Sequence, residues 1–227
     1  MSTAAPLPIP LGDNSPPIFT LVDLAQRFGE IPATRICLSP APGHATEQDA
    51  IDFQERDKRL FELVDGTLIE KTMGRTESII AINISRLIGN YLRTNPIGAV
   101  MGADGMLQLF PGRIRIPDVS FISLQRGRKA GISKHKVAPL AADLAVEVIS
   151  PGNSRQEMAD KLHEYFSHGT LEVWYVYPVR QELHQYQSPD NFTVLTSEQT
   201  LTTPQLLPGF AMSMAEAFFD PFAEPNP

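Results

Sequence analysis

The chain has 227 residues, of which 42% are hydrophobic, and a formal net charge of −7. This length predicts one domain with short appendages, and the acidic balance argues against a protein that coats nucleic acid nonspecifically. No apolar run approaches the roughly 18 residues that a membrane helix needs, and the N-terminus lacks the basic residues and apolar stretch of a secretory signal. A single cysteine, Cys37, excludes an internal disulfide and favours a reducing, cytoplasmic location.

The N-terminal part of the chain predicts a tail and two short helices. Residues 1–18 are rich in proline and read as flexible or extended. Residues 19–28 have helical spacing and are followed by a glycine, and Thr46 with Asp49 predicts a capped helix ending near residue 57. The expected organisation is a tail at 1–18, a helical extension at 19–58, a main domain at 59–220 and a C-terminal tail at 221–227.

A hairpin and a long helix follow. Residues 61–64 and 67–70 are strand-like segments joined by Asp65-Gly66, which is a strong hairpin signal. Within this hairpin we expect Glu62 to be a surface strand residue. Residues 76–92 carry apolar side chains at helical spacing and predict a helix.

The remaining segments predict strands, one crossover helix and an added hairpin. A helix is expected at 154–168, a hairpin at 182–195 and a last short helix at 213–219. Most strands precede the crossover helix, which predicts a mixed α/β sheet flanked by helices rather than a regularly alternating one. The other expected strands are 97–101, 106–110, 116–122, 144–149 and 171–177.

Two acidic residues interrupt apolar strands. Asp118 follows Pro117 at the start of one strand, and Glu147 lies inside another that otherwise reads as fully buried. An unpaired buried carboxylate is unfavourable or becomes protonated. If the two strands are neighbours, both carboxylates can face one groove. The open alternatives are a salt bridge between Glu147 and a structural cation, and an Asp118 that caps a turn.

Lys161 lies on the flank of the helix predicted at 154–168. It is three residues after Met158 and four before Tyr165, so it borders the buried stripe of that helix. A lysine in this position either extends to solvent, which is the usual outcome, or reaches across the sheet toward Glu147. The short connection from the Glu147 strand makes the helix pack back on the sheet.

A basic segment lies between the two acidic strands. Residues 126–136 contain five cationic side chains and no acidic one, and two arginines lie just upstream. Such a segment is usually a solvated loop, but its position also suits contacts with backbone phosphates. The candidate phosphate-binding residues are Arg113, Arg115, Arg126, Arg128, Lys129, Lys134 and Lys136.

These features together resemble the PD-(D/E)xK nuclease superfamily, which has the restriction-endonuclease-like fold. The usual lysine, two positions after the second acid, is replaced by Ile149. The chain is similar to a restriction-endonuclease branch that moves this lysine to the following helix, where Lys161 fits. The resemblance runs from about residue 30 to 220. The matching parts are 41–47, 61–66, 73–78, 102–106, 115–121, 145–151 and 207–210, with Lys161, Tyr165 and Trp174.

The resemblance implies a restriction-endonuclease-like core with added β-hairpins and N-terminal helices. It further implies metal-dependent hydrolysis of DNA, with RNA as an alternative substrate, and a homodimer for cutting two strands. Asp118 and Glu147 would hold Mg²⁺ or Mn²⁺ together with the carbonyl of Val148. Lys161 would act in catalysis, and Glu77 would join the metal site unless it merely complements its helix dipole.

Three other functions are compatible with the sequence. The fold could serve only to bind nucleic acid or protein, without cleavage. Two carboxylates could act as acid and base on a substrate that is not a nucleic acid. Glu147 and Lys161 could also form a purely structural salt bridge.

Overall fold

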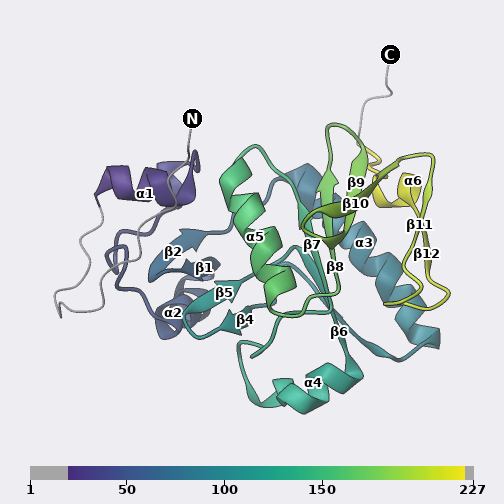
Figure 1. Ribbon diagram of the computed structural model, residues 1–227, viewed down its shortest axis with the longest axis horizontal. Coiled ribbons are helices and arrows are strands. Elements are labelled where there is room, and N and C mark those ends of the chain that lie inside the picture. The colour runs from purple at the N-terminus through teal and green to yellow at the C-terminus, as the bar shows by residue number, and fades with distance from the viewer. Residues whose placement is uncertain (1–19, 223–227) are drawn as a thin grey trace.

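A six-stranded mixed sheet runs through the centre of the structure, a computed structural model that describes residues 20–222 (Figure 1). Its strands are β3 (Gly98–Met101), β6 (Val119–Ser123), β7 (Leu144–Val148), β8 (Glu172–Tyr177), β9 (Glu182–Ser188) and β10 (Asn191–Thr196). Their order across the sheet is β10-β9-β8-β7-β6-β3. Only β7 and β8 are parallel neighbours; the other pairs are antiparallel. The predicted mixed α/β sheet is confirmed.

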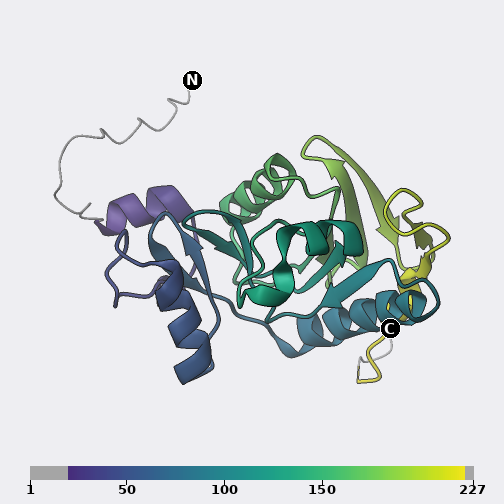
Figure 2. The same ribbon diagram turned by 90° about the horizontal axis from the view of Figure 1, so that it is seen from below.

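Two helices cover opposite faces of this sheet. Helix α5 (Arg155–Ser167) forms the crossover between the parallel strands β7 and β8, and helix α3 (Arg75–Thr94) lies on the other side (Figures 1 and 2). Ser154 and Glu157 form a capping box at the start of α5, which satisfies backbone donors at this helix end. The predicted crossover helix is therefore confirmed.

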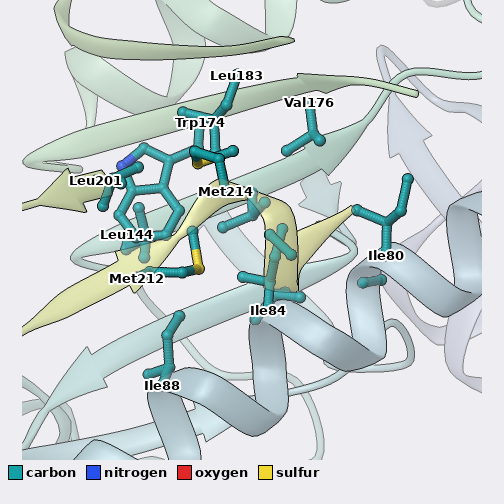
Figure 3. Packing of buried hydrophobic residues seen from close by; sticks show 14 of the residues in the cluster. Ile80, Ile84, Ile88, Leu144, Trp174, Val176, Leu183, Leu201, Met212 and Met214 are labelled. Carbon is teal, nitrogen blue, oxygen red and sulfur yellow. The ribbon is translucent and has the colours of Figure 1, made fainter. Parts of the chain in front are cut away.

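Side-chain alternation along β7 divides the core into two layers. Val146 and Val148 join the cluster that contains Ile84 of α3, part of which is shown in Figure 3. Ala145, on the opposite face, joins the cluster that contains Tyr165 of α5. Because successive strand residues point to opposite faces, Glu147 lies on the α5 side.

A smaller, four-stranded sheet flanks the large one. Its strands are β1 (Phe61–Val64), β2 (Thr67–Glu70), β4 (Leu107–Phe110) and β5 (Arg113–Arg115), in the order β2-β1-β5-β4. The predicted hairpin of β1 and β2 is confirmed, with Asp65 and Gly66 both at positive φ in the turn. Strand β5 was not expected, because its alternating Arg-Ile-Arg pattern is short and charged.

The predicted N-terminal helices are present as α1 (Leu21–Phe28) and α2 (Glu47–Asp57). Both begin with capping boxes, Thr20 with Asp23 and Thr46 with Asp49. Leu24 and Phe28 of α1 pack on the small sheet, and Ala50 of α2 joins that sheet's second apolar cluster. The tail predicted at 1–18 lies outside the described residues, as does most of the one at 221–227.

The basic segment is largely helical, which corrects the expectation of a loop. Helix α4 (Leu124–Ala130) follows β6 directly, and a 3-10 turn, η2 (Ile132–Lys134), comes next. The buried Gly127 of α4 lies close to Ile122 and Ile132, and these contacts hold the helix in place. The sequence of α4 lacks the apolar periodicity that would have predicted a helix.

The chain ends with small elements against the α3 face. They are β11 (Thr200–Thr202), β12 (Ala211–Ser213) and α6 (Met214–Ala217). Leu201, Met212 and Met214 from this region join the core beside Trp174 (Figure 3). Apart from these elements, a short 3-10 turn, η1 (Ala33–Arg35), follows α1 near the start of the described chain. Over residues 20–222, no helix combines the length and the apolar character needed to cross a membrane.

Candidate active site

Asp118 and Glu147 lie on adjacent antiparallel strands, which meets the condition under which both carboxylates can face one groove. Asp118 immediately precedes β6, and its backbone N–H donates to the carbonyl of Val146 at 2.9 Å. In return, the N–H of Val148 donates to Asp118 Oδ2 at 2.7 Å. Both carboxylates are buried, with 6% and 5% of their residue surfaces exposed. The pairing of β6 with β7 therefore brings the two acids to the same end of the strand pair.

Lys161 reaches across to Glu147 rather than extending to solvent. Its Nζ lies 3.2 Å from Glu147 Oε1 and 2.9 Å from Glu62 Oε1. Burial alone would lower the pKa of Lys161, but the charges of Glu147 and Glu62 outweigh it and raise this pKa above its ordinary range. Lys161 is therefore a charged ammonium enclosed by two carboxylates.

Glu62 is the main residue that the sequence placed wrongly. It is buried in β1, where Arg115 Nη1 donates to its Oε2 at 2.9 Å and the N–H of Ile116 donates to its Oε1 at 3.1 Å. Burial opposes its ionisation, but Lys161 and Arg115 hold its pKa well below the usual range. The expectation of a surface residue fails because Lys161 of α5 and Arg115 of β5 cover the side chain of Glu62.

Glu147 has the opposite electrostatic balance. Burial raises its pKa, Lys161 counteracts this effect, and the nearby charge of Asp118 raises the pKa further. Tyr165, one turn after Lys161, donates its hydroxyl to Glu147 Oε1 at 2.7 Å. Among the described residues, no hydrogen bond engages the other oxygen, Oε2. Glu147 thus has one oxygen without a hydrogen bond from the described residues, and the positive charge of Lys161 does not fully offset the effects of burial and of Asp118 on its pKa.

Lys71 is a second lysine at this site, and no periodic pattern in the sequence indicated it. It follows β2 directly, and its Nζ lies 2.8 Å from Asp118 Oδ1. The same ammonium donates to the carbonyl of Ile116. The hairpin region therefore contributes one carboxylate, Glu62, and one ammonium, Lys71, to a site that we expected to be built from β6, β7 and α5 with Glu77 of α3.

A buried polar stripe along α5 continues the site. Glu157, Lys161, Glu164 and Tyr165 recur at helical spacing. The two glutamates of this stripe face arginines from the N-terminal region and the small sheet, whereas Lys161 and Tyr165 face carboxylates. Arg35 binds Glu157 at 2.8 Å, and Arg115 Nε donates to Glu164 Oε2 at 2.7 Å. The signal that could have revealed this stripe was the i, i+4, i+7 spacing of charges next to an apolar stripe.

Arg113 and Arg115 are inside the molecule, which corrects their expected role at a nucleic-acid surface. Arg115 is paired with Glu62 and Glu164, and Arg113 with Asp65 and Glu164. Only 6% of Arg113 and 2% of Arg115 is exposed. Guanidinium groups that are buried against carboxylates have no free face for a phosphate.

Glu77 is not part of the charge network around Lys161 in the described structure. It is in the first turn of α3, the helix that packs on the sheet face opposite to Glu147. Its carboxylate folds over the helix start, since a Cβ on Gly74 would lie 2.2 Å from its Oε2. No ion pair or hydrogen bond between residues 20 and 222 joins Glu77 to Asp118, Glu147 or Lys161. This placement fits the alternative of an acid that complements the helix dipole.

The rest of the predicted basic surface is exposed but distant from the acids along β6. Arg128, Lys129 and Lys134 are exposed, Arg126 is paired with Asp143, and Lys136 with Glu55. Helix α4 begins where β6 ends, whereas Asp118 precedes the start of that strand. A strand of this length spans about 17 Å.

The donor set suits a hard divalent cation that keeps part of its water shell. Within the described part of the chain, no group of three or more His, Cys, Asp or Glu side chains is arranged to hold a metal ion. Mg²⁺, however, is commonly bound through one or two carboxylates plus water and substrate oxygens. Asp118 and Glu147 supply two such carboxylates, and their mutual repulsion would be relieved by a cation between them.

The architecture is that of a restriction-endonuclease-like protein: a mixed sheet with a β7-α5-β8 crossover and acids on adjacent strands. Residues 47–215 match the model of the Uma2 family, described as "Putative restriction endonuclease", and the chain belongs to this family. The match begins inside the predicted N-terminal extension. No curated protein sequence matches the chain.

A solved structure shares this fold. It is a protein from Anabaena variabilis ATCC 29413 that is described as a "putative nuclease belonging to DUF820". The two chains are 19% identical, with a TM-score of 0.61 over 71% of this chain and 90% of the other. At this identity the likeness shows the fold alone.

Proposed function

We propose that this protein is a metal-dependent endonuclease that hydrolyses phosphodiester bonds of DNA. The observation that supports this most is the convergence of Asp118 and Glu147, from adjacent strands, with Lys161 from the crossover helix. The family and the fold of the chain agree with this reaction class. Fold by itself does not define chemistry, so the proposal rests on the site.

Asp118 and Glu147 would hold Mg²⁺ or Mn²⁺, with the carbonyl of Val148 as a further ligand. When bound, such an ion lowers the pKa of a coordinated water and polarises the phosphate. Tyr165 fixes the orientation of Glu147 through its hydroxyl, which leaves Oε2 free for the cation. The contribution of the protein is therefore to hold two carboxylates in place on rigid strands.

Lys161 would stabilise the negative charge that develops on the phosphate during hydrolysis. Its charge is secured by Glu62 and Glu147, and α5 fixes its position. Glu62 positions Lys161 together with Glu147, a role for which no residue was predicted from the sequence.

The segment formed by α4 and η2 would contact the DNA backbone away from the scissile bond. Arg128, Lys129 and Lys134 present exposed positive charge, and Arg126 and Lys136 lie at its borders. Contacts of this kind are salt-sensitive and largely independent of base sequence. The net charge of −7 limits nonspecific binding to this local surface.

A homodimer would allow both strands of a duplex to be cut. Strand β10 is at the edge of the large sheet and exposes Phe192 and Val194, with 45% and 41% of their surfaces accessible. An edge strand with exposed apolar residues suits pairing with a second copy. Sedimentation equilibrium of wild type and Val194→Lys would test this, because a dimer through β10 should weaken in the variant.

Cleavage of single- and double-stranded DNA and RNA, with Mn²⁺, Mg²⁺ or chelator, tests the reaction. Asp118→Asn, Glu147→Gln and Lys161→Met should each abolish cleavage. Glu172→Gln is a matched control. Glu172 is a buried carboxylate of β8 that accepts hydrogen bonds from Trp174 and Gln185 and has no part in the proposed site. Activity that persists in all three site variants, or in chelator, would refute the mechanism. DNA binding without any cleavage would favour the alternative of an inactive nuclease-fold module.

A further inference from the structure

Both oxygens of Asp118 already have partners within the protein. Oδ2 accepts the N–H of Val148, and Oδ1 is paired with the ammonium of Lys71 at 2.8 Å. The backbone bond belongs to the pairing of β6 with β7 and is fixed by the fold. The Lys71 contact is the one that can be exchanged, because it is made by a flexible side chain.

We propose that Lys71 is a built-in counterion, which neutralises Asp118 in the metal-free protein and is displaced from it when a divalent cation binds. This inference rests on the proposed function, because it takes Asp118 as a ligand of the cation. A cation at Oδ1 and the ammonium of Lys71 would repel each other at short range, so both cannot keep this position. Lys71 thereby lowers the affinity of the site for metal and acts as a positioning residue for Asp118.

The two lysines of the site are not equivalent. Lys161 is enclosed by two carboxylates, and 5% of its side chain is exposed. Lys71 has one carboxylate partner and one neutral carbonyl, and 10% of its side chain is exposed. Lys71 also lies outside regular structure, between β2 and the start of α3. Release of Lys71 therefore leaves one carboxylate to be compensated, and the incoming cation compensates it.

Titration of the full chain with Mn²⁺ in a calorimeter, without DNA, tests the proposal. Lys71→Met should bind Mn²⁺ about 10- to 100-fold more tightly than wild type. Loss of a group that supports a metal ligand typically weakens binding by this factor, whereas loss of a group that competes with the metal should strengthen it. Lys71→Arg keeps the charge and should bind like wild type. Arg75→Met is a matched control, because it removes the cation beside Asp220, a largely buried carboxylate that the proposed site does not use. It should leave the affinity unchanged.

A second measurement uses the wild type, so that it does not depend on how well Lys71→Met folds. Acetic anhydride labelling followed by peptide mass spectrometry reports the reactivity of each lysine. Saturating Mn²⁺ should increase labelling of Lys71 several-fold in wild type, but not in Asp118→Asn, and should leave Lys58 unaffected in both.

The outcomes separate this inference from the proposed function. Mn²⁺ binding that is lost in Asp118→Asn, but is no tighter in Lys71→Met and does not change Lys71 labelling, overturns the counterion role and leaves the metal site standing. Absence of Mn²⁺ binding in wild type and Lys71→Met overturns both. Tighter binding in Lys71→Met than in Lys71→Arg supports the counterion role.

Discussion

Lys161 Nζ lies 2.9 Å from Glu62 Oε1, which ties the crossover helix to the hairpin of the smaller sheet through a buried ion pair. The same ammonium contacts Glu147 on the central sheet. One side chain therefore joins α5 and β7 to β1, which is far from both in the sequence, and the shape of the site depends on it.

Replacement of Lys161 by methionine should destabilise the protein by about 3–5 kcal/mol, because it leaves Glu62 and Glu147 buried beside each other without their shared cation. Urea unfolding followed by circular dichroism measures this change. Lys58→Met, which removes an exposed lysine, is the control and should have little effect. A loss of stability below about 1 kcal/mol for Lys161→Met would mean that Glu62 and Glu147 are accessible to water and are not enclosed with Lys161.

The Glu62→Gln variant should lose stability in a pH-dependent way. The pKa of Glu62 in the folded protein lies below its ordinary value of 4.5, so the unfolded chain binds this proton more readily. The stabilisation from Glu62 is therefore complete above that ordinary value and is lost as the pH falls through the folded pKa. We expect Glu62→Gln to cost about 1.5–3 kcal/mol at pH 7, as for lost hydrogen bonds to charged groups.

Unfolding curves at several pH values between neutral and acidic measure this difference. The gap between wild type and Glu62→Gln should stay constant down to the ordinary pKa of a glutamate and should narrow below it. A gap that widens toward acid would contradict the direction of the pKa shift.

The hydroxyl of Tyr165 should contribute more than a neutral hydrogen bond, because its acceptor is the carboxylate of Glu147. We expect Tyr165→Phe to destabilise the fold by about 1.5–3 kcal/mol. Tyr175→Phe is a matched control, since the buried Tyr175 hydroxyl donates to the neutral carbonyl of Met158 and should contribute about 0.5–1.5 kcal/mol. Thermal unfolding of the two variants compares them, and equal losses would argue against an ionised Glu147 in the folded state.

The α4–η2 segment should determine the salt dependence of DNA binding. Replacing Arg128, Lys129 and Lys134 by alanine should weaken binding to all sequences alike and reduce the salt slope by about 0.9 for each phosphate contact that is lost. Fluorescence anisotropy at several salt concentrations measures both. Arg93, Arg155 and Arg180 are exposed on other elements, and their triple alanine variant is the control for net charge. Equal effects of the two variants would assign binding to overall charge.

Much of the fold follows from local patterns in the sequence. The Asp65-Gly66 turn defined the hairpin, and the capping pair of Thr46 and Asp49 defined the start of α2, because these features act between residues close in the chain. Pairing of the Asp118 and Glu147 strands was a condition for a shared site, and the fold meets this condition.

Tertiary structure alone decided which other charges belong to the site. Glu62, Lys71, Arg115 and Glu77 carry no local mark that separates a site residue from a surface residue. Their roles depend on which face of the hairpin is covered by α5 and which face of the sheet is covered by α3. The sequence by itself determined the six strands of the central sheet and the two acids, because alternation is a property of the chain. The partners of those acids were decided by the packing of the two sheets, because ion pairs form between residues that only the folded chain brings together.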